Sequence, residues 1–97
     1  MPLTEKQKRH LRALGHKLKP VVLTGAAGLT EAVYKEIDAA LTCHELIKVR
    51  VNAEEREIRE EMIGEICNHT GADLVQRIGH IALFFRRNQE RPRVQLP

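Results

Sequence analysis

The stretch that organises this chain is VVLTGAAGLTEAVYKEIDAALTCHELIKVRV, residues 21–51. Its first part, Val21–Thr24, predicts a short buried strand, because the preceding Pro20 favours extended backbone. Thr30 is a suitable helix N-cap, and apolar residues recur at helical spacing at Leu29, Val33, Ile37, Ala40 and Leu41. Leu46–Val51 alternates apolar and polar side chains, which predicts a second strand. The stretch therefore predicts a strand–helix–strand crossover, the unit that joins two strands of one sheet.

A helix is predicted on each side of this unit. In Thr4–Gly15, Thr4 and Gln7 match the capping box, and Gly15 suits the left-handed position past a helix end. The apolar stripe of this helix consists of Leu11, Leu14 and Leu18. In a third helix Asn52 is the expected N-cap and Gly71 the expected end, and the predicted inner side carries Ile58, Met62, Ile66 and Thr70.

Two further strands, Asp73–Ile78 and Ile81–Arg87, flank Gly79-His80. A two-residue loop that begins with glycine favours a type II′ hairpin turn. The element order is therefore α-β-α-β-α-β-β. It predicts a two-layer α/β fold in which helices pack on a four-stranded mixed sheet.

The hairpin loop determines which side chains share a face of the sheet. It pairs Ile78 with Ile81 and Leu74 with Phe85, and this apolar face is expected to meet the helices. The opposite face is expected to present the basic residues Lys48, Arg50, Arg77 and Arg86 around Phe84. Phe84 itself is predicted to be covered, as most aromatic side chains are. An exposed Phe84 would instead allow bases of single-stranded RNA to stack on its ring.

The composition indicates one soluble, folded domain. Of the 97 residues, 42% are hydrophobic and 30% charged, which excludes both a disordered chain and a membrane span. The domain is expected to comprise residues 1–97, with a core at about 4–87 and a flexible polar tail at 88–97. The N-terminus lacks the apolar segment of a signal peptide, and Cys43 and Cys67 form no C-x-x-C pair. A reduced protein that stays in the cytoplasm is therefore expected.

Charge is distributed unevenly along the chain. The net charge of +3 combines +5 in residues 1–19 and +4 in residues 74–97 with −1 in residues 20–53 and −5 in residues 54–73. If the fold brings the two basic ends together, one face of the molecule is positive and the other negative. Such a positive face suits a polyanion such as nucleic acid.

The motif with the clearest chemistry is Gly25-Ala26-Ala27-Gly28, between the first strand and the second helix. Glycine permits strained backbone and alanine adds little bulk, so a sugar–phosphate backbone can approach closely. Backbone N–H groups and the positive end of the helix dipole would face its phosphates. KH domains clamp RNA with a Gly-x-x-Gly loop in this way, but a tight strand-to-helix turn can also carry two glycines for structural reasons. The G-K-[ST] ending of a P-loop and the G-x-G-x-x-G spacing of dinucleotide sites are both missing.

Several of these motifs occur together in a known family. LKPVVLTGAAGLTEAVYKEIDAALTCHELIKVRV and the later GADLVQRIGHIALFFRR closely resemble the CRM domain, for chloroplast RNA splicing and ribosome maturation, in its stand-alone bacterial YhbY type. The resemblance covers about residues 4–87, and GLTEAV, HELIKV and LVQRIG carry most of it. It implies a fold similar to the C-terminal domain of translation initiation factor 3.

The resemblance implies an RNA-binding protein that is not an enzyme. Bacterial members look like assembly factors for precursors of the large ribosomal subunit, and plant members act in group II intron splicing. The implied partner is ribosomal RNA in pre-large-subunit particles, bound by a monomer in the cytoplasm. No cofactor, small-molecule substrate or membrane is expected.

The family's Gly-x-x-Gly loop falls on Gly25–Gly28, with Ala26 and Ala27 where many relatives have a basic or polar residue. Phosphate contact is then expected from backbone amides and from nearby Lys17 and Lys19. The complete set of predicted RNA-binding residues is Lys8, Arg9, Arg12, Lys17, Lys19, Gly25, Ala26, Ala27, Gly28, Lys48, Arg50, Arg77 and Arg86.

Three other interpretations compete with RNA binding. The acidic third helix would suit a protein-interaction adaptor that docks a basic ribosomal partner. A hydrolase would need residues assembled only in space, because no Ser/His/Asp or Cys/His spacing supports one. A zinc site would combine Cys43, His44, Cys67 and His69, but adjacent Cys43 and His44 cannot easily chelate one ion, and the other two point apart on a helix. We therefore expect no catalytic residue and no bound metal.

Overall fold

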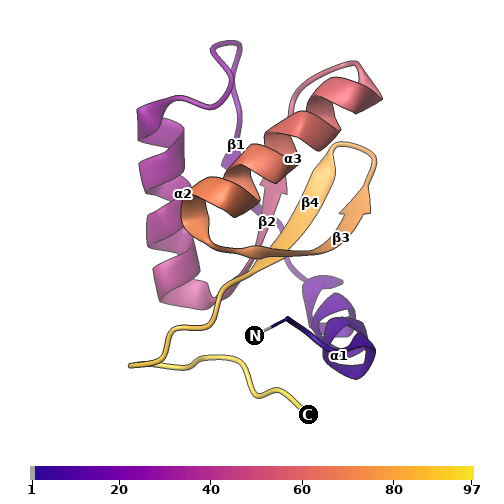
Figure 1. Ribbon diagram of the computed structural model, residues 1–97, viewed down its shortest axis with the longest axis vertical. Helices are drawn as coiled ribbons and strands as arrows, with labels where there is room; N and C mark the ends of the chain where they lie inside the picture. Colours follow the sequence, from indigo (N-terminus) through magenta and orange to yellow (C-terminus); the bar gives the residue numbers. More distant parts are fainter. Residues whose placement is uncertain (1) are drawn as a thin grey trace.

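The computed structural model describes residues 2–97, and within that range the chain forms three helices and four strands in the predicted order (Figure 1). They are α1 (Glu5–Gly15), β1 (Pro20–Leu23), α2 (Glu31–His44), β2 (Leu46–Arg50), α3 (Arg56–Thr70), β3 (Asp73–Ile78) and β4 (Ile81–Phe85). The sheet order is β1-β2-β4-β3, with β1 parallel to β2 and β4 antiparallel to both neighbours. The predicted α/β fold with a mixed sheet is confirmed. None of the helices in residues 2–97 has the length and apolar character that crossing a membrane requires.

The two faces of the sheet are covered unequally. On one face α2 and α3 bury the larger core, which consists of Val22, Ile37, Leu41, Ile47, Val49, Val51, Ile63, Ile66, Ala72, Ala82 and Phe84. On the other face α1 helps to bury a smaller cluster, which consists of Leu11, Leu46, Val75, Leu83 and Phe85. Because α1 is short and lies at the lower end of the molecule in Figure 1, part of this second face stays open.

Local capping chemistry places several element ends where the sequence predicts them. Thr4 Oγ1 accepts the Gln7 N–H at 3.1 Å while Gln7 Oε1 accepts the Thr4 N–H at 3.0 Å, a complete capping box. Thr30 likewise caps α2 through its hydroxyl. Gly71 ends α3 with φ +74°, and Gly79 begins the hairpin loop with φ +57°. The sequence predicts these element ends correctly because each one depends on residues that lie close together in the chain.

Gly15 was predicted to end the helix in left-handed backbone conformation, but it serves the packing of the helix against the sheet. It lies inside α1, and the next residue, His16, caps the helix with right-handed backbone (φ −55°, ψ −34°). A Cβ built at Gly15 would lie 2.6 Å from Leu83 Cδ2. Glycine at this position therefore lets α1 approach the sheet more closely than any other residue would.

Two predicted apolar segments are less buried than expected. In the α1 stripe only Leu11 is buried, and in β1, an edge strand, only Val22 is buried. The exposed members of these segments are Leu14, Leu18, Val21 and Leu23. They all belong to the side of the sheet that α1 covers incompletely.

The third helix begins later than an Asn52 N-cap predicts. It starts at Arg56, and no side chain caps its first turn. Ile66 and Thr70 are buried as predicted, whereas Ile58, predicted to face inward, is 41% exposed and Ile63 is buried instead. Asn52 forms hydrogen bonds elsewhere, as described below.

The hairpin register departs from the prediction away from the loop. The pairs nearest the loop are as predicted, but a β-bulge between Leu74 and Gln76 shifts the remainder. Leu74 therefore pairs with Phe84 instead of Phe85. A bulge adds one unpaired residue to one strand, so counting outward from the loop fails beyond it.

The face of the hairpin that carries Leu83, predicted to meet the helices, meets only α1, and the opposite face packs against α2 and α3. In the observed register Ile47 lies opposite Phe84 and Val49 opposite Ala82, so these four side chains share a face. This is the face that α2 and α3 bury, and Phe84 is fully buried there, as predicted. Leu83 belongs to the α1 side of the sheet.

The four basic side chains predicted to share a face are divided between two faces. Lys48 and Arg50 alternate with the core residues of β2 and lie on the α1 side. Arg77 lies on the other side, where its Nη2 donates to Glu60 of α3 at 3.1 Å. Arg86 is also on that side and binds α2 and the last residue of α3. The division follows from strand alternation combined with the observed register.

The C-terminal tail, predicted to be flexible, has no helix or strand but lies against the smaller cluster through Val94 and Leu96. Its anchor is Glu45, which is fully buried and has left-handed backbone with φ +64°. The Glu45 carboxylate accepts hydrogen bonds from the backbone N–H groups of Asn88, Arg93 and Val94 and from the Arg87 guanidinium. A buried carboxylate needs such donors, and the tail supplies them.

Burial by itself would raise the pKa of the Glu45 carboxyl, but three backbone N–H groups and the Arg87 guanidinium hold that pKa below its ordinary value. A lowered pKa in the folded state means that ionised Glu45 stabilises the fold at neutral pH. This contribution is lost only as the pH falls through the lowered pKa.

We predict that Glu45→Gln lowers the free energy of unfolding at neutral pH by about 2 kcal/mol, because an amide cannot accept the same charge-assisted hydrogen bonds. The difference from the parent should begin to shrink below the ordinary carboxyl pKa of 4.5, where unfolded Glu45 binds a proton, and should vanish below the lowered pKa of the folded state. Urea unfolding at neutral and acidic pH measures both effects. Glu90→Gln, which changes an exposed carboxyl of the tail, is the matched control. Equal stability of the Glu45→Gln variant and the parent at neutral pH would refute this anchor.

Candidate nucleic-acid interface

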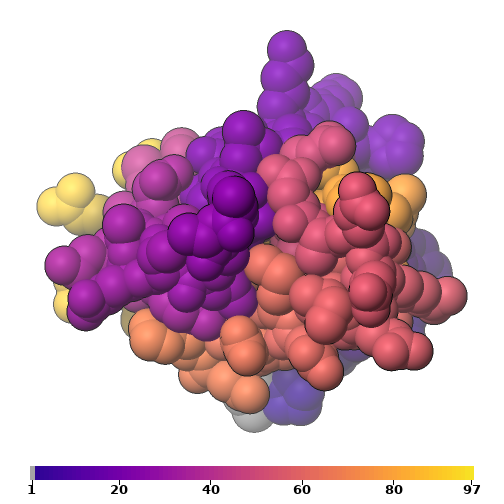
Figure 2. Space-filling model, turned by 90° about the horizontal axis from the view of Figure 1, so that it is seen from above, coloured from indigo at the N-terminus to yellow at the C-terminus, as the bar shows by residue number. Residues whose placement is uncertain are grey.

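The Gly25–Gly28 loop protrudes from the upper end of the molecule, between β1 and α2 (Figure 1). The Gly28 N–H donates to the Gly25 carbonyl at 3.0 Å and closes a tight turn, and Gly28 has φ +73°, a conformation that side chains rarely allow. Ala26 and Ala27 at the tip are exposed. Figure 2 looks onto this end and shows the start of α2 beside α3, with the loop toward the viewer. The loop is therefore accessible to a large ligand.

The amides at the tip of the loop are available to a ligand. Within residues 2–97, the backbone N–H groups of Ala26 and Ala27 donate to no protein atom. They lie four and three residues before Thr30, the N-cap of α2, and therefore outside the first turn in which the helix dipole acts. Unbonded backbone amides in a turn nevertheless bind anions such as phosphate. The loop thus has the donors that the predicted backbone clamp needs.

Asn52 ties the base of this loop to β2. Its backbone N–H donates to Thr24 Oγ1 at 2.8 Å, and its side-chain Nδ2 donates to the Thr24 carbonyl at 2.7 Å. Its Oδ1 accepts a hydrogen bond from Arg50 Nε at 3.0 Å. One amide side chain therefore holds the end of β1 and orients a cation beside it. Sequence reasoning assigned Asn52 to a helix cap, because nothing local marks a partner 28 residues away.

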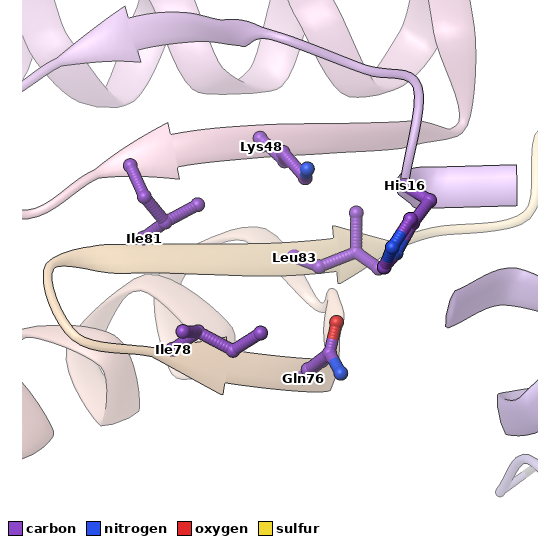
Figure 3. Close-up of a pocket in the computed structure, with 6 residues that line it drawn as sticks. All are labelled: His16, Lys48, Gln76, Ile78, Ile81 and Leu83. Carbon is purple, nitrogen blue, oxygen red and sulfur yellow. The ribbon is translucent and has the colours of Figure 1, made fainter. Parts of the chain in front are cut away.

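Lys48 lies in the middle of the uncovered part of the second sheet face. A shallow hollow of about 220 Å³ there is lined by His16, Lys48, Gln76, Ile78, Ile81 and Leu83. Figure 3 shows these side chains on one side of β2, β4 and β3, with His16 at the end of α1. Arg50 pairs with Ile81 in the sheet and extends the group toward the loop. These six residues and Arg50 are called the open sheet face below.

Lys17 and Lys19 do not lie beside the loop, contrary to the expectation. They precede β1, which starts opposite Lys48 and ends opposite Arg50. The loop follows the far end of β1, so a four-residue strand, about 13 Å long, separates the two lysines from it. The cations consequently form a line along the strands, and the one nearest the loop is Arg50.

The predicted basic residues of α1 are farther from the loop. Figure 1 shows α1 and the loop at opposite ends of a molecule whose longest dimension is 37 Å. Arg9 is exposed, and Lys8 and Arg12 are half-buried. The structure thus brings Arg50 near the loop, whereas Lys48 lies opposite the start of β1 and the α1 cations lie farther away still.

The open sheet face includes no phenylalanine or tyrosine side chain. Within residues 2–97, Phe84 and Phe85 are 0% and 2% exposed. Tyr34 of α2 stacks on His69 of α3, with ring centroids 3.8 Å apart, on the other side of the molecule. Burial and the charge of nearby Glu65 raise the pKa of Tyr34. Contacts on the open sheet face therefore rest on charge and aliphatic side chains, and the planar groups on which a base could stack are the His16 imidazole and the Arg50 guanidinium.

The fold and the loop define the class of this chain: a small α/β domain with a mixed sheet and a Gly-x-x-Gly loop ahead of its second helix. Residues 3–86 match the family model of the CRS1/YhbY (CRM) domain. The chain belongs to this family, which confirms the resemblance found in its sequence.

Curated relatives and a solved structure are similar over nearly the whole chain. A Haemophilus influenzae protein named "RNA-binding protein" is 47% identical over 95 residues, which cover 98% of this chain and 95% of that protein. A Pseudomonas aeruginosa protein named "Probable RNA-binding protein" is 46% identical over 88 residues, or 91% of this chain and 85% of that protein. The solution structure of a hypothetical Staphylococcus aureus protein matches with a TM-score of 0.85 at 36% identity, covering 99% of this chain and 100% of that one.

We predict that Asn52→Ala and Asn52→Asp both loosen the loop, because each variant loses the Nδ2–H donor to the Thr24 carbonyl. The Asp variant keeps an acceptor for Arg50 and the Ala variant does not. Comparing the two variants therefore distinguishes the hydrogen bond that holds the loop from the one that orients Arg50. Each lost hydrogen bond should cost about 1 kcal/mol of stability. Amide hydrogen exchange at Thr24 and Gly28 should become faster in both variants. Unchanged exchange rates at both amides would show that Asn52 does not hold the base of the loop.

Proposed function

We propose that this chain binds RNA through the Gly25–Gly28 loop and the open sheet face. The observation that carries the proposal is the pair of unbonded amides at Ala26 and Ala27, tied through Asn52 to the strand that bears Lys48 and Arg50. Phosphates bind to such amides and cations. The names of the relatives support RNA as the class of ligand.

Recognition in this proposal is mainly of the sugar–phosphate backbone. Backbone contacts fix the position and register of the RNA but do not depend on its base sequence. Selectivity therefore comes from the shape of the RNA. Arg50 and the loop bind one segment of the RNA, and Lys48 continues the track toward Lys17 and Lys19. The cations of α1 contact the RNA only when it is long enough to extend along the molecule to that helix.

The biological role that we propose is assembly of the large ribosomal subunit, with precursor ribosomal RNA as the target. The chain would act in the cytoplasm as a monomer that holds folded RNA and catalyses no reaction. Membership of the CRM family supports this role. The alternative, docking of a basic ribosomal protein on α3, has less support because Glu60 already pairs with Arg56 and Arg77.

Ala27→Asp should weaken RNA binding about tenfold, because it places a carboxylate among the amides that would hold phosphate. Ala27→Asn adds a side chain of the same shape without the charge and should bind within about twofold of the parent. Position 27 is preferable to Gly28, where positive φ would strain any side chain. Fluorescence anisotropy with a labelled RNA hairpin measures affinity, and thermal melting checks the fold. Equal affinities of the parent and the Asp variant would show that the loop does not contact RNA.

Replacing Lys48 and Arg50 by Gln should reduce the salt dependence of RNA binding. Each lost phosphate contact lowers the slope of log K against log salt by about 0.7–0.9. Lys35→Gln, an exposed lysine of α2 outside the open sheet face, is the control and should leave the slope unchanged. A parental slope in the Lys48/Arg50 double variant would place the phosphate contacts elsewhere.

Ultraviolet crosslinking in cells tests the target with the same variants. Crosslinks to precursor RNA of the large subunit that fall in the double variant would support both the interface and the role. Crosslinks confined to other RNAs would overturn the assembly role but not RNA binding. A nuclease-resistant complex with a basic ribosomal protein would favour the adaptor alternative.

A further inference from the structure

An apolar groove lies beside the open sheet face and is not needed for phosphate contact. It has a volume of about 480 Å³ and runs between the end of α1 and the starts of β1 and β2. Three of the most exposed large apolar side chains of residues 2–97 line it: Leu14 is 42% exposed, Leu18 38% and Val21 49%. Large apolar side chains that gather at one exposed place indicate a binding surface.

The rim of this groove is basic. Lys17, Lys19 and Lys48 line it, and no acidic residue does. Two of these lysines come from the α1–β1 connection and one from β2, so positive charge borders the apolar floor on more than one side. An occupant with complementary chemistry carries aliphatic side chains next to carboxylates.

The lining favours a protein segment over RNA. Nucleobases bind single-stranded RNA sites mainly by stacking on aromatic rings, and the only such ring among the lining residues is the imidazole of His44, beside six aliphatic side chains. Leucine and valine side chains gain free energy when they bury other aliphatic groups. Amphipathic segments commonly dock in apolar grooves of this kind, and flanking charge sets their specificity.

We propose that this groove docks an acidic amphipathic segment of a partner protein. Its aliphatic side chains lie on Leu14, Leu18 and Val21, and its carboxylates pair with the rim lysines. This inference goes beyond RNA binding. Because the rim lysines Lys17, Lys19 and Lys48 also belong to the proposed RNA track, the segment and RNA compete for them.

Nuclear magnetic resonance titration of the full chain tests the proposal with three short synthetic peptides. The first combines Glu and Leu at helical spacing, the second has Gln for every Glu, and the third has Ser for every Leu. Only the first should shift the amide signals of residues 14–21 and 46–48. Leu18→Ser and Val21→Ser should each weaken its binding about tenfold, since each removes one apolar contact. Ile58→Ser, an exposed apolar residue of α3, is the matched control and should bind like the parent.

RNA affinity is measured on the same variants, and Leu18→Ser and Val21→Ser should retain it within about twofold. Loss of RNA binding in these two variants would assign the groove to RNA and overturn the proposal. Equal binding of the Gln peptide would show that carboxylates do not pair with the rim lysines. If the signals of the same residues shift with protein concentration in the absence of peptide, the occupant of the groove is a second copy of this chain. Failure of the acidic peptide to bind would also overturn the proposal, while the loop and Lys48/Arg50 variants would still decide RNA binding independently.

Discussion

The central strand β2 pairs with β1 on one side and with β4 on the other, and the alternation of its side chains determines what each face of the sheet does. Ile47 and Val49 point into the larger core beneath α2 and α3, so Lys48 and Arg50 must point to the opposite face. A shift of the strand by one residue would bury two cations and expose two branched apolar side chains. The free energy of that core therefore sets the position of the basic surface.

The proposed RNA interface depends on the same strand in a second way. Directly after β2, Asn52 reaches back to Thr24 and fixes where β1 ends and the Gly-x-x-Gly loop begins. It also contacts Arg50, so the loop and the nearest cation are held by one side chain. A flexible loop would lose conformational entropy on binding RNA, and holding its base reduces that cost.

Much of the architecture could be predicted because its signals are local. Helical spacing, the Thr4 capping box and the strand–helix–strand pattern lie within short windows, and so does the Gly25–Gly28 motif. What could not be predicted depends on partners far apart in the chain. The register of β4 with β2 places Ala82 and Phe84, instead of Leu83, on the face of the larger core, and Asn52 bonds to Thr24 at the end of a distant strand instead of capping a neighbouring helix. Candidate basic residues were identified by type, but their division between two faces required the register.

The Glu45 carboxylate also has a consequence for biosynthesis. Its donors come from residues 87–94, which are translated after all the helices and strands of residues 2–97. Until that segment has been made, closing this end of the sheet would leave a buried charge without partners, at a cost of several kcal/mol. The nascent domain can therefore form its larger core early, but it completes its second face only after these residues have emerged. A ribosome that stalls before them leaves this corner hydrated and open to proteolysis.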